Sequence, residues 1–239
     1  MKRKTAWFIG LVLVSPLVAH ASMSVKIAQV HGEVKVRRGV EEKWERAGVG
    51  MLLEEIDTIM ALEGAEVVLD FGERATFRLG GNAILDIADL RVITERELFL
   101  LLMSEKIGKL KPREGKIPLR IGEVSAVRGG PFQKADSHAT KSETPRWRME
   151  ANAAQALHEQ NFLTNAALKF HRVKAAFPQR GDCGVVSYEL AQTFEALKQS
   201  GKARDEYQSA LEEMKAQNCE GNIAQARITQ TQEALQRLK

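Results

Sequence analysis

The chain has 239 residues, of which 44% are hydrophobic and 28% charged, and its formal net charge at pH 7 is +4. Three of the basic groups lie at residues 2–4, and without them the net charge falls to +1, so the composition gives no reason to expect a nucleic-acid partner. A chain of this length suits one large domain or two small ones.

The N-terminus has the pattern of a cleaved secretory signal. Basic residues at 2–4 precede an apolar run at 6–19, and Ala19-His20-Ala21 supplies two small residues spaced by one. The run is shorter than the roughly 20 residues needed to span a bilayer. We expect residues 1–21 to be a signal peptide removed after Ala21, with an uncleaved anchor as the alternative. No other segment has the length and apolarity of a membrane span. We therefore expect the exported protein to be located in the periplasm.

Residues 25–132 have the pattern of short β-strands. Apolar residues alternate with polar ones at Val25 and Ile27 and again at Val34 and Val36, and the alternation continues further along, interrupted by glycine-containing turns. Such strands, spaced about 8–12 residues apart, predict an antiparallel β sandwich or roll. Turns are the expected role of the glycines, because no helix start follows them to form a phosphate site.

The same segment resembles the FecR domain of bacterial envelope proteins. The likeness rests on a Gly-x-Val opening, a tryptophan before a turn, a leucine, an aspartate, and a closing strand that begins near an asparagine: Gly32, Val34, Trp44, Leu52, Asp57, Leu69, Leu79, Asn82, Leu85 and Ile87. A later family segment corresponds to "SAVRGGPF" at 125–132.

This chain departs from the FecR pattern at several positions, which marks a divergent member. Ile56 stands where a glycine is usual, and Ala61 and Gly130 stand where threonines are usual. We expect Asp57 to accept backbone N–H bonds in a tight turn and Trp44 to cover an open edge of the sheet. Arg128 is either a surface charge or the partner of a buried carboxylate.

Residues 133–145, "QKADSHATKSETP", are polar and aperiodic, which predicts a linker. From residue 146 the period becomes helical, and a repeat appears when the chain is shifted by 37 residues. The shift aligns small with small and large with large residues: Ala154 with Ala191, Leu157 with Phe194, Ala166 with Ala203, and Phe170 with Tyr207. Each unit reads as two helices, with the second unit turning at Gly201-Lys202 and a last helix capping the array.

Residues 146–239 therefore resemble the tetratricopeptide repeat, a helical hairpin of 34 residues. A plain hairpin with an ordinary core stripe is the alternative. The resemblance implies a concave groove, lined by the first helix of each unit, that takes a peptide or protein. The polar residues on those helices are the candidate binding residues: Asn152, Gln155, Glu159, Glu189, Gln192 and Thr193.

The two cysteines of the chain flank the second predicted hairpin. In such a unit the helices run antiparallel, so Cys183, before the first helix, and Cys219, after the second, should lie at the same end. In an oxidising compartment this predicts a Cys183–Cys219 disulfide, worth roughly 4 kcal/mol by chain-entropy arguments. Two unrelated free thiols are the alternative. A metal site is disfavoured because two cysteines lack the further ligands.

The remaining polar residues do not form a catalytic pattern. The histidines outside the predicted signal peptide, His31, His138, His158 and His171, have no serine or cysteine nucleophile at a recognisable spacing, and the last two are expected on exposed helix faces. Carboxylate pairs such as Asp86 and Asp89 lie near turns, where acidic residues are common. We therefore expect no enzyme activity, no cofactor and no metal.

The sequence thus predicts a multidomain β + α protein of the Gram-negative envelope, with a FecR-like β domain at 25–132 and helical repeats at 146–239. The expected function is a non-enzymatic interaction, sensor or scaffold module with an envelope protein or peptide partner. The alternative is binding of cell-wall glycan by the β domain, although Trp44 is the only tryptophan there to form a platform. Regulators with FecR domains also carry a membrane helix and a cytoplasmic region, which this sequence does not have. We therefore expect no direct signalling across the inner membrane. The sequence does not predict the oligomeric state.

Overall fold

The computed structural model describes residues 24–72, 75–108 and 144–238. The predicted signal peptide at 1–21, the segment 125–132 and nearly all of the predicted linker at 133–145 lie outside the described residues. Within the described ranges, every helix is too short or too polar to cross a lipid bilayer.

The described N-terminal part forms two four-stranded antiparallel sheets, as the alternating pattern predicted. The first sheet has the order β4 (Leu52–Leu53), β1 (Val25–His31), β6 (Glu66–Asp70) and β7 (Thr76–Leu79). The second has the order β3 (Trp44–Arg46), β2 (Val34–Arg37), β5 (Thr58–Ala61) and β8 (Ala83–Asp86).

The alternation of apolar residues along the strands becomes an alternation of burial. Ile27 on β1 pairs with Leu69 on β6, and Val25 pairs with Leu53 on β4, and all four side chains have no exposed surface. Residues two apart on a strand point to the same face, so this pattern places them in the core. The buried side chains of both sheets belong to one continuous apolar core.

Gly32 joins β1 to β2 at a point where no larger residue fits. Its φ is +74°, and a Cβ at this position would lie 2.8 Å from the Cα of Ala65. Both the left-handed backbone and the close approach of a neighbouring turn therefore require glycine here.

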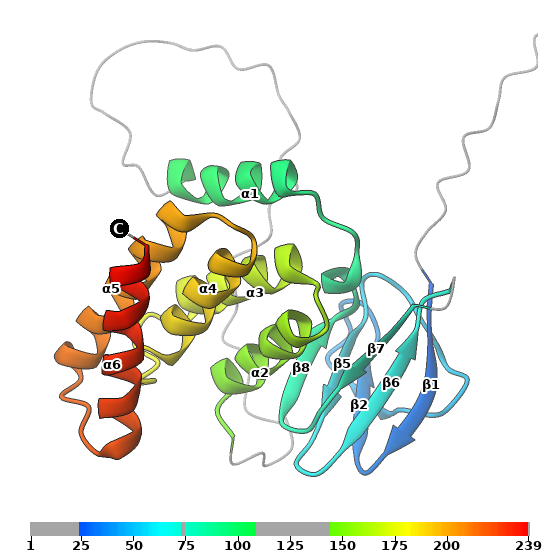
Figure 1. Ribbon diagram of the computed structural model, residues 1–239. Helices are drawn as coiled ribbons and strands as arrows, with labels where there is room; N and C mark the ends of the chain where they lie inside the picture. The colour runs from blue at the N-terminus through cyan, green and yellow to red at the C-terminus, as the bar shows by residue number, and fades with distance from the viewer. Residues whose placement is uncertain (1–23, 73–74, 109–143, 239) are drawn as a thin grey trace, which may run out of the picture.

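The prediction that the strand pattern extends to residue 132 is wrong at residues 87–108, and residues 109–132 lie outside the described residues. Residues Ile87–Leu90 form a 3₁₀ turn, and Glu95–Gly108 form helix α1. The sequence ERELFLLLMSEK is rich in strong helix formers, and Leu98 and Leu102, one turn apart, are buried to 0% and 5% exposure. In Figure 1, α1 crosses above the helical part and away from the sheets.

Five further helices make up the described C-terminal part: α2 (Arg146–Glu159), α3 (Leu163–Ala176), α4 (Val185–Ala196), α5 (Ser200–Ala216) and α6 (Asn222–Arg237). The first four form two antiparallel hairpins, α2–α3 and α4–α5, and α6 packs on α5 (Figure 1). A β part followed by an α part is therefore the observed architecture.

The 37-residue repeat is visible in the packing. The eight aligned residues are all 2% exposed or less: Ala154, Leu157, Ala166, Phe170, Ala191, Phe194, Ala203 and Tyr207. Alanines let paired helices approach closely, and the large residues fill the space between them. The two hairpins thus use equivalent positions for equivalent contacts.

The turn inside the second hairpin differs from the prediction. Gly201-Lys202 lies in the first turn of α5, and the chain reverses instead at Lys198, whose φ is +58°. The corresponding residue of the first hairpin, Asn161, has φ +65°. Each hairpin therefore turns through one residue in the left-handed region, and a lysine occupies it in the second hairpin.

The two parts of the protein pack directly against each other. Helix α2 lies along β8, and α3 contacts the 3₁₀ turn that follows it (Figure 1). The ring of Phe162, between α2 and α3, packs edge-to-face against Phe71 and Phe77, with ring centres 5.9 and 5.7 Å apart. The apolar core runs through both parts without interruption.

Polar contacts fix the relative positions of the two parts. Asn165 Nδ2 donates to the carbonyl oxygens of Asp89 and Arg91, each at 2.7 Å. The side-chain amide of Gln160 binds both backbone groups of Arg78, accepting from its N–H at 2.8 Å and donating to its C=O at 2.7 Å. Gln160 thereby pairs with the edge strand β7 as a neighbouring strand would.

Candidate functional site

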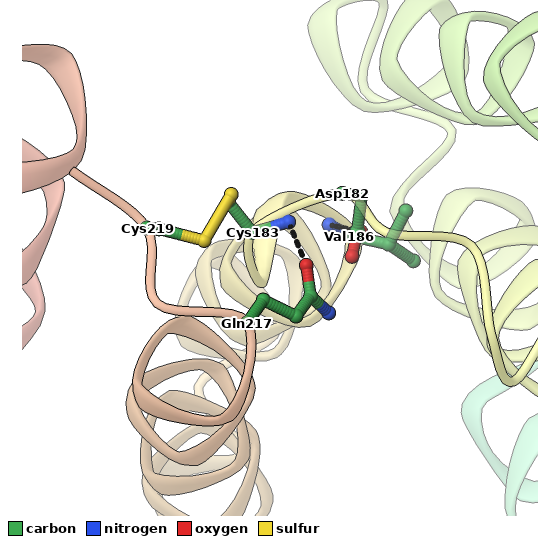
Figure 2. Close-up of a disulfide and its surroundings, with 5 residues drawn as sticks. All are labelled: Asp182, Cys183, Val186, Gln217 and Cys219. Atoms are coloured by element: carbon green, nitrogen blue, oxygen red, sulfur yellow. Dashed lines mark hydrogen bonds between the residues drawn. A yellow bond between two sulfur atoms is a disulfide. The ribbon is translucent and has the colours of Figure 1, made fainter. Parts of the chain in front are cut away.

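A disulfide closes the base of the second hairpin. Cys183 and Cys219 have sulfurs 2.13 Å apart and Cα atoms 5.9 Å apart, so the predicted pairing is present. Figure 2 shows the bond joining the segment before α4 to the loop between α5 and α6. Beside it, the backbone N–H of Cys183 donates to Gln217 Oε1 at 2.7 Å, and that of Val186 donates to Asp182 Oδ2 at 2.8 Å.

The backbone next to the disulfide is tightly constrained. Gly184 has φ +68°, and a Cβ there would lie 2.6 Å from the carbonyl oxygen of Ala210 on α5. Arg180 crosses the same region and binds Asp182 at 2.7 Å and Glu213 at 2.5 Å, with its side chain 3% exposed. The start of α4 is thus fixed covalently to the loop after α5, and through the ion pair of Arg180 with Glu213 to α5 itself.

The disulfide matters for the position of α6. Only Thr231 and Ala234 of this helix are buried, and Ile223 near its start is 78% exposed. With so little apolar anchoring, α6 depends on the loop that Cys219 ties to the start of α4.

The face formed by α2, α4 and α6 is the candidate site, and we refer to it as the helical groove. Three hollows that described residues line lie along it. One of about 460 Å³ lies between α2 and the β7–β8 turn, one of about 490 Å³ lies among α2, α4 and Arg227 of α6, and one of about 480 Å³ lies among α4, α5 and α6 near the C-terminal end of α2. Each has the size of a small-ligand or side-chain subsite.

The predicted residues of α2 line the groove, but Asn152 also holds the fold together. Its Nδ2 donates to the backbone oxygen of Asn82 at 2.7 Å, across the junction with the β part. Gln155 and Glu159 are exposed and bonded to each other at 2.9 Å. Gln155 lines two of the hollows and is therefore central in the groove.

The predicted residues of α4 reach different hollows. Glu189 is half-buried and lines the middle hollow. Burial raises the pKa of its carboxyl, and the nearby charge of Glu159 raises it further. The positive charge of Arg227 acts in the opposite direction but is outweighed, so the pKa is raised. Gln192 lines the hollow near the end of the groove, where its amide donates to the hydroxyl of Tyr188 at 3.1 Å.

Three expectations about single residues are wrong, and one of them is His171, which was expected on an exposed helix face and is half-buried. Thr193 is fully buried beneath the groove and does not line it. His158, expected on an exposed helix face, is half-buried, and its Nδ1 lies 2.9 Å from Thr193 Oγ1. Burial lowers the pKa of this histidine despite the nearby Glu159, which favours the charged form.

Several groove residues could not be found from the sequence pattern. All are aromatic or charged except Gln230, and they come from the ends of α2 and α4 and from the last helix: Trp147, Arg148, Tyr188, Glu195, Arg227, Gln230, Glu233 and Arg237. Helix α6 was expected only to cap the array. Its polar side was the available signal, but a solvated helix has the same pattern.

Asp57 and Trp44 are the two residues of the β part for which the sequence predicts a structural role. Asp57, 3% exposed, accepts from the backbone N–H groups of Gly39 and Glu54, each at 2.9 Å, which confirms its predicted role. Arg38 Nη1 adds a third bond at 2.8 Å. Trp44 lies on the edge strand β3, with the guanidinium of Arg37 5.5 Å from its ring centre.

A comparison of the chain with protein-family models, curated proteins and solved structures finds no match.

Proposed function

We propose that this protein is an exported bacterial envelope protein that binds a protein or peptide partner in its helical groove, as a non-enzymatic interaction, sensor or scaffold module. The proposal retains the likeness of its β part to FecR domains and of its helices to tetratricopeptide repeats. Its location in the periplasm follows from the signal-like residues 1–21.

The observation that carries the proposal is the composition of the groove. Three helices contribute amide, carboxylate, guanidinium and hydroxyl groups to neighbouring hollows of about 460–490 Å³ each. A row of small polar hollows suits a chain with a side chain every few ångströms better than it suits one compact substrate. The groove also stands on rigid hairpins, which lowers the entropic cost of binding.

Glycan binding by the β part has less support. A sugar-binding platform needs an exposed aromatic face, and the only tryptophan of that part, Trp44, is half-buried with Arg37 over its ring. Pull-down with purified peptidoglycan distinguishes the two functions. A glycan-binding protein would be retained on the peptidoglycan, and its Trp44→Ala variant would not.

Site-specific photo-crosslinking in intact cells tests the groove. A photoreactive residue at Gln155 or Gln192 should give a crosslink to the same partner protein. The matched control is Gln208, an exposed residue of α5 that lines none of the hollows described above. Absence of adducts at both groove positions, or the same adducts from position 208, would rule out the proposal.

A further inference from the structure

The hollow of about 480 Å³ at the end of the groove has a lining that selects one kind of side chain. The half-buried Tyr188 contributes aromatic surface, and the buried Tyr207 packs edge-to-face against it, with 5.7 Å between ring centres. The faces of such rings carry partial negative charge and attract cations.

Histidine adds a hydrogen-bond acceptor to this lining. Thr193 Oγ1 donates its single proton to the backbone oxygen of Glu189 at 2.8 Å, so its contact with His158 must be one in which Nδ1–H donates. The neutral ring therefore carries its proton on Nδ1 and leaves Nε2 as an acceptor. Burial, which lowers the pKa of His158, favours this neutral form.

Two carboxylates complete the lining. Glu195 accepts from the hydroxyl of Tyr207 at 2.8 Å through one oxygen, and its other oxygen lies 3.3 Å from Arg237 Nη2. Glu233 is exposed on the same hollow and forms no ion pair or hydrogen bond with any described residue. Among the described charged side chains that line this hollow, the two acidic groups outnumber the single cation, Arg237.

An organic cation fits this set better than a metal ion does. Among the described residues, no three His, Cys, Asp or Glu side chains converge into a metal-binding group. Aromatic faces beside separated carboxylates instead suit the long apolar stem and charged end of lysine or arginine.

Arg237 has the position of such a cation in the unbound protein. It lies on the last turn of α6, its side chain is 60% exposed, and its bond to Glu195 is long. An exposed ion pair of this kind contributes at most about 1 kcal/mol, so an incoming cation can displace it.

We propose that this hollow is a subsite for a lysine or arginine side chain of the partner, and that Arg237 occupies part of it until the partner binds. The inference rests on the proposed function, because it specifies the partner of the same groove. It adds that the partner presents a basic residue to the end of the groove that Tyr188, Glu195 and Glu233 form.

A titration of the purified protein with small probes tests the subsite. Nα-acetyl-lysine methylamide is added while the NMR signals of His158 and Tyr188 are followed, and Nα-acetyl-glutamate methylamide is the matched probe. Saturable shifts with the lysine probe alone are expected. Equal shifts with the glutamate probe, or no shifts with the lysine probe, overturn the inference.

Variants separate the placeholder from the subsite. Glu233→Gln should weaken binding of the lysine probe about threefold, and Arg237→Ala should strengthen it about threefold, because it removes the competing cation. Glu212→Gln and Arg96→Ala, at exposed positions that line none of the described hollows, are the charge-matched controls. Weaker binding in Arg237→Ala overturns the placeholder role.

The crosslinking experiment remains independent of these results. A groove partner that is found by crosslinking while the lysine probe fails to bind would refute the subsite and leave the proposed function standing.

Discussion

Lys169 on α3 and Asp89, just after β8, form a buried ion pair, with Lys169 Nζ 2.5 Å from Asp89 Oδ2 and each side chain 5% exposed. Burial acts to lower the pKa of Lys169, but Asp89 and Asp86 outweigh it and the net effect is a raised pKa, so the lysine stays charged. Arg172 Nη1 binds the second oxygen of Asp89 at 3.2 Å. The pair therefore connects the helical part to the β part through charges that have little access to water.

Removing one member of this pair should cost much more than removing a surface lysine. Lys169→Met leaves the Asp89 carboxylate buried with only the half-exposed Arg172, and we expect a loss of about 3–5 kcal/mol in the free energy of unfolding. Lys215→Met, at an exposed position of α5, should change it by no more than about 0.5 kcal/mol. Urea unfolding measures both, and a loss below about 1 kcal/mol for Lys169→Met would show that the pair is not effectively buried.

The shared core predicts that both parts unfold together. Outside residues 1–21, the chain has one tryptophan in each part, Trp44 and Trp147, so Trp→Phe variants report each part separately by fluorescence. We expect the two unfolding curves to have the same midpoint, because separating the parts would expose apolar side chains of both. Two clearly separated midpoints would indicate independent domains.

Loss of the disulfide should act mainly on α6. The free energy of unfolding of the double variant Cys183→Ser/Cys219→Ser should be about 2–4 kcal/mol lower. The reason is that no disulfide between residues 36 positions apart then restricts the unfolded chain. Amide hydrogen exchange should accelerate more in α6 than in α2, since α6 has only two buried side chains. A uniform acceleration across both helices would contradict this assignment.

Asp57 should make stability depend on acidity. Burial acts to raise the pKa of its carboxyl, but bonds from the backbone of Glu54 and Gly39 and from Arg38 outweigh it, so the net pKa is below the ordinary value of 3.8. A lowered folded-state pKa stabilises the protein above pH 3.8, and this contribution disappears as the pH falls through the lower value.

The variant Asp57→Asn tests this contribution. The asparagine amide would direct its N–H groups at the donors that now bind Asp57. We therefore expect the free energy of unfolding to fall by about 1–3 kcal/mol near neutral pH. The difference from the unmodified protein should shrink at pH values below 3.8. Asp205→Asn, at an exposed position, is the control, and a difference that is independent of pH would refute the ionic role.

Gln160 should protect the edge of the first sheet. Its amide satisfies both backbone groups of Arg78 on β7, which would otherwise be open to another chain. Gln160→Leu should lower the free energy of unfolding by about 1–2 kcal/mol. It should also increase self-association, which sedimentation velocity measures. Gln208→Leu on α5 is the matched control, and equal association of the two variants would exclude a specific role for the edge.

The sequence determined those features that depend on local periodicity. Alternation at Val25 and Ile27 fixed which side of the strand is buried, and the 37-residue shift identified the buried positions of both hairpins. The disulfide followed from antiparallel helices, since residues that flank such a hairpin must meet at one end. In each case the interacting residues are near in the chain or related by a repeat.

Only the tertiary structure decided how the two parts meet and what the groove contains. Lys169 and Asp89 are 80 residues apart, and each alone reads as a surface charge on its own element. Helix α1 was missed because the periodicity of a short apolar run does not distinguish a strand from a helix. The elements that pack against the run determine which of the two forms. The hollow lined by Tyr188, Glu195 and Arg237 depends on the angle of α6, which is set by packing and by a covalent bond rather than by local sequence.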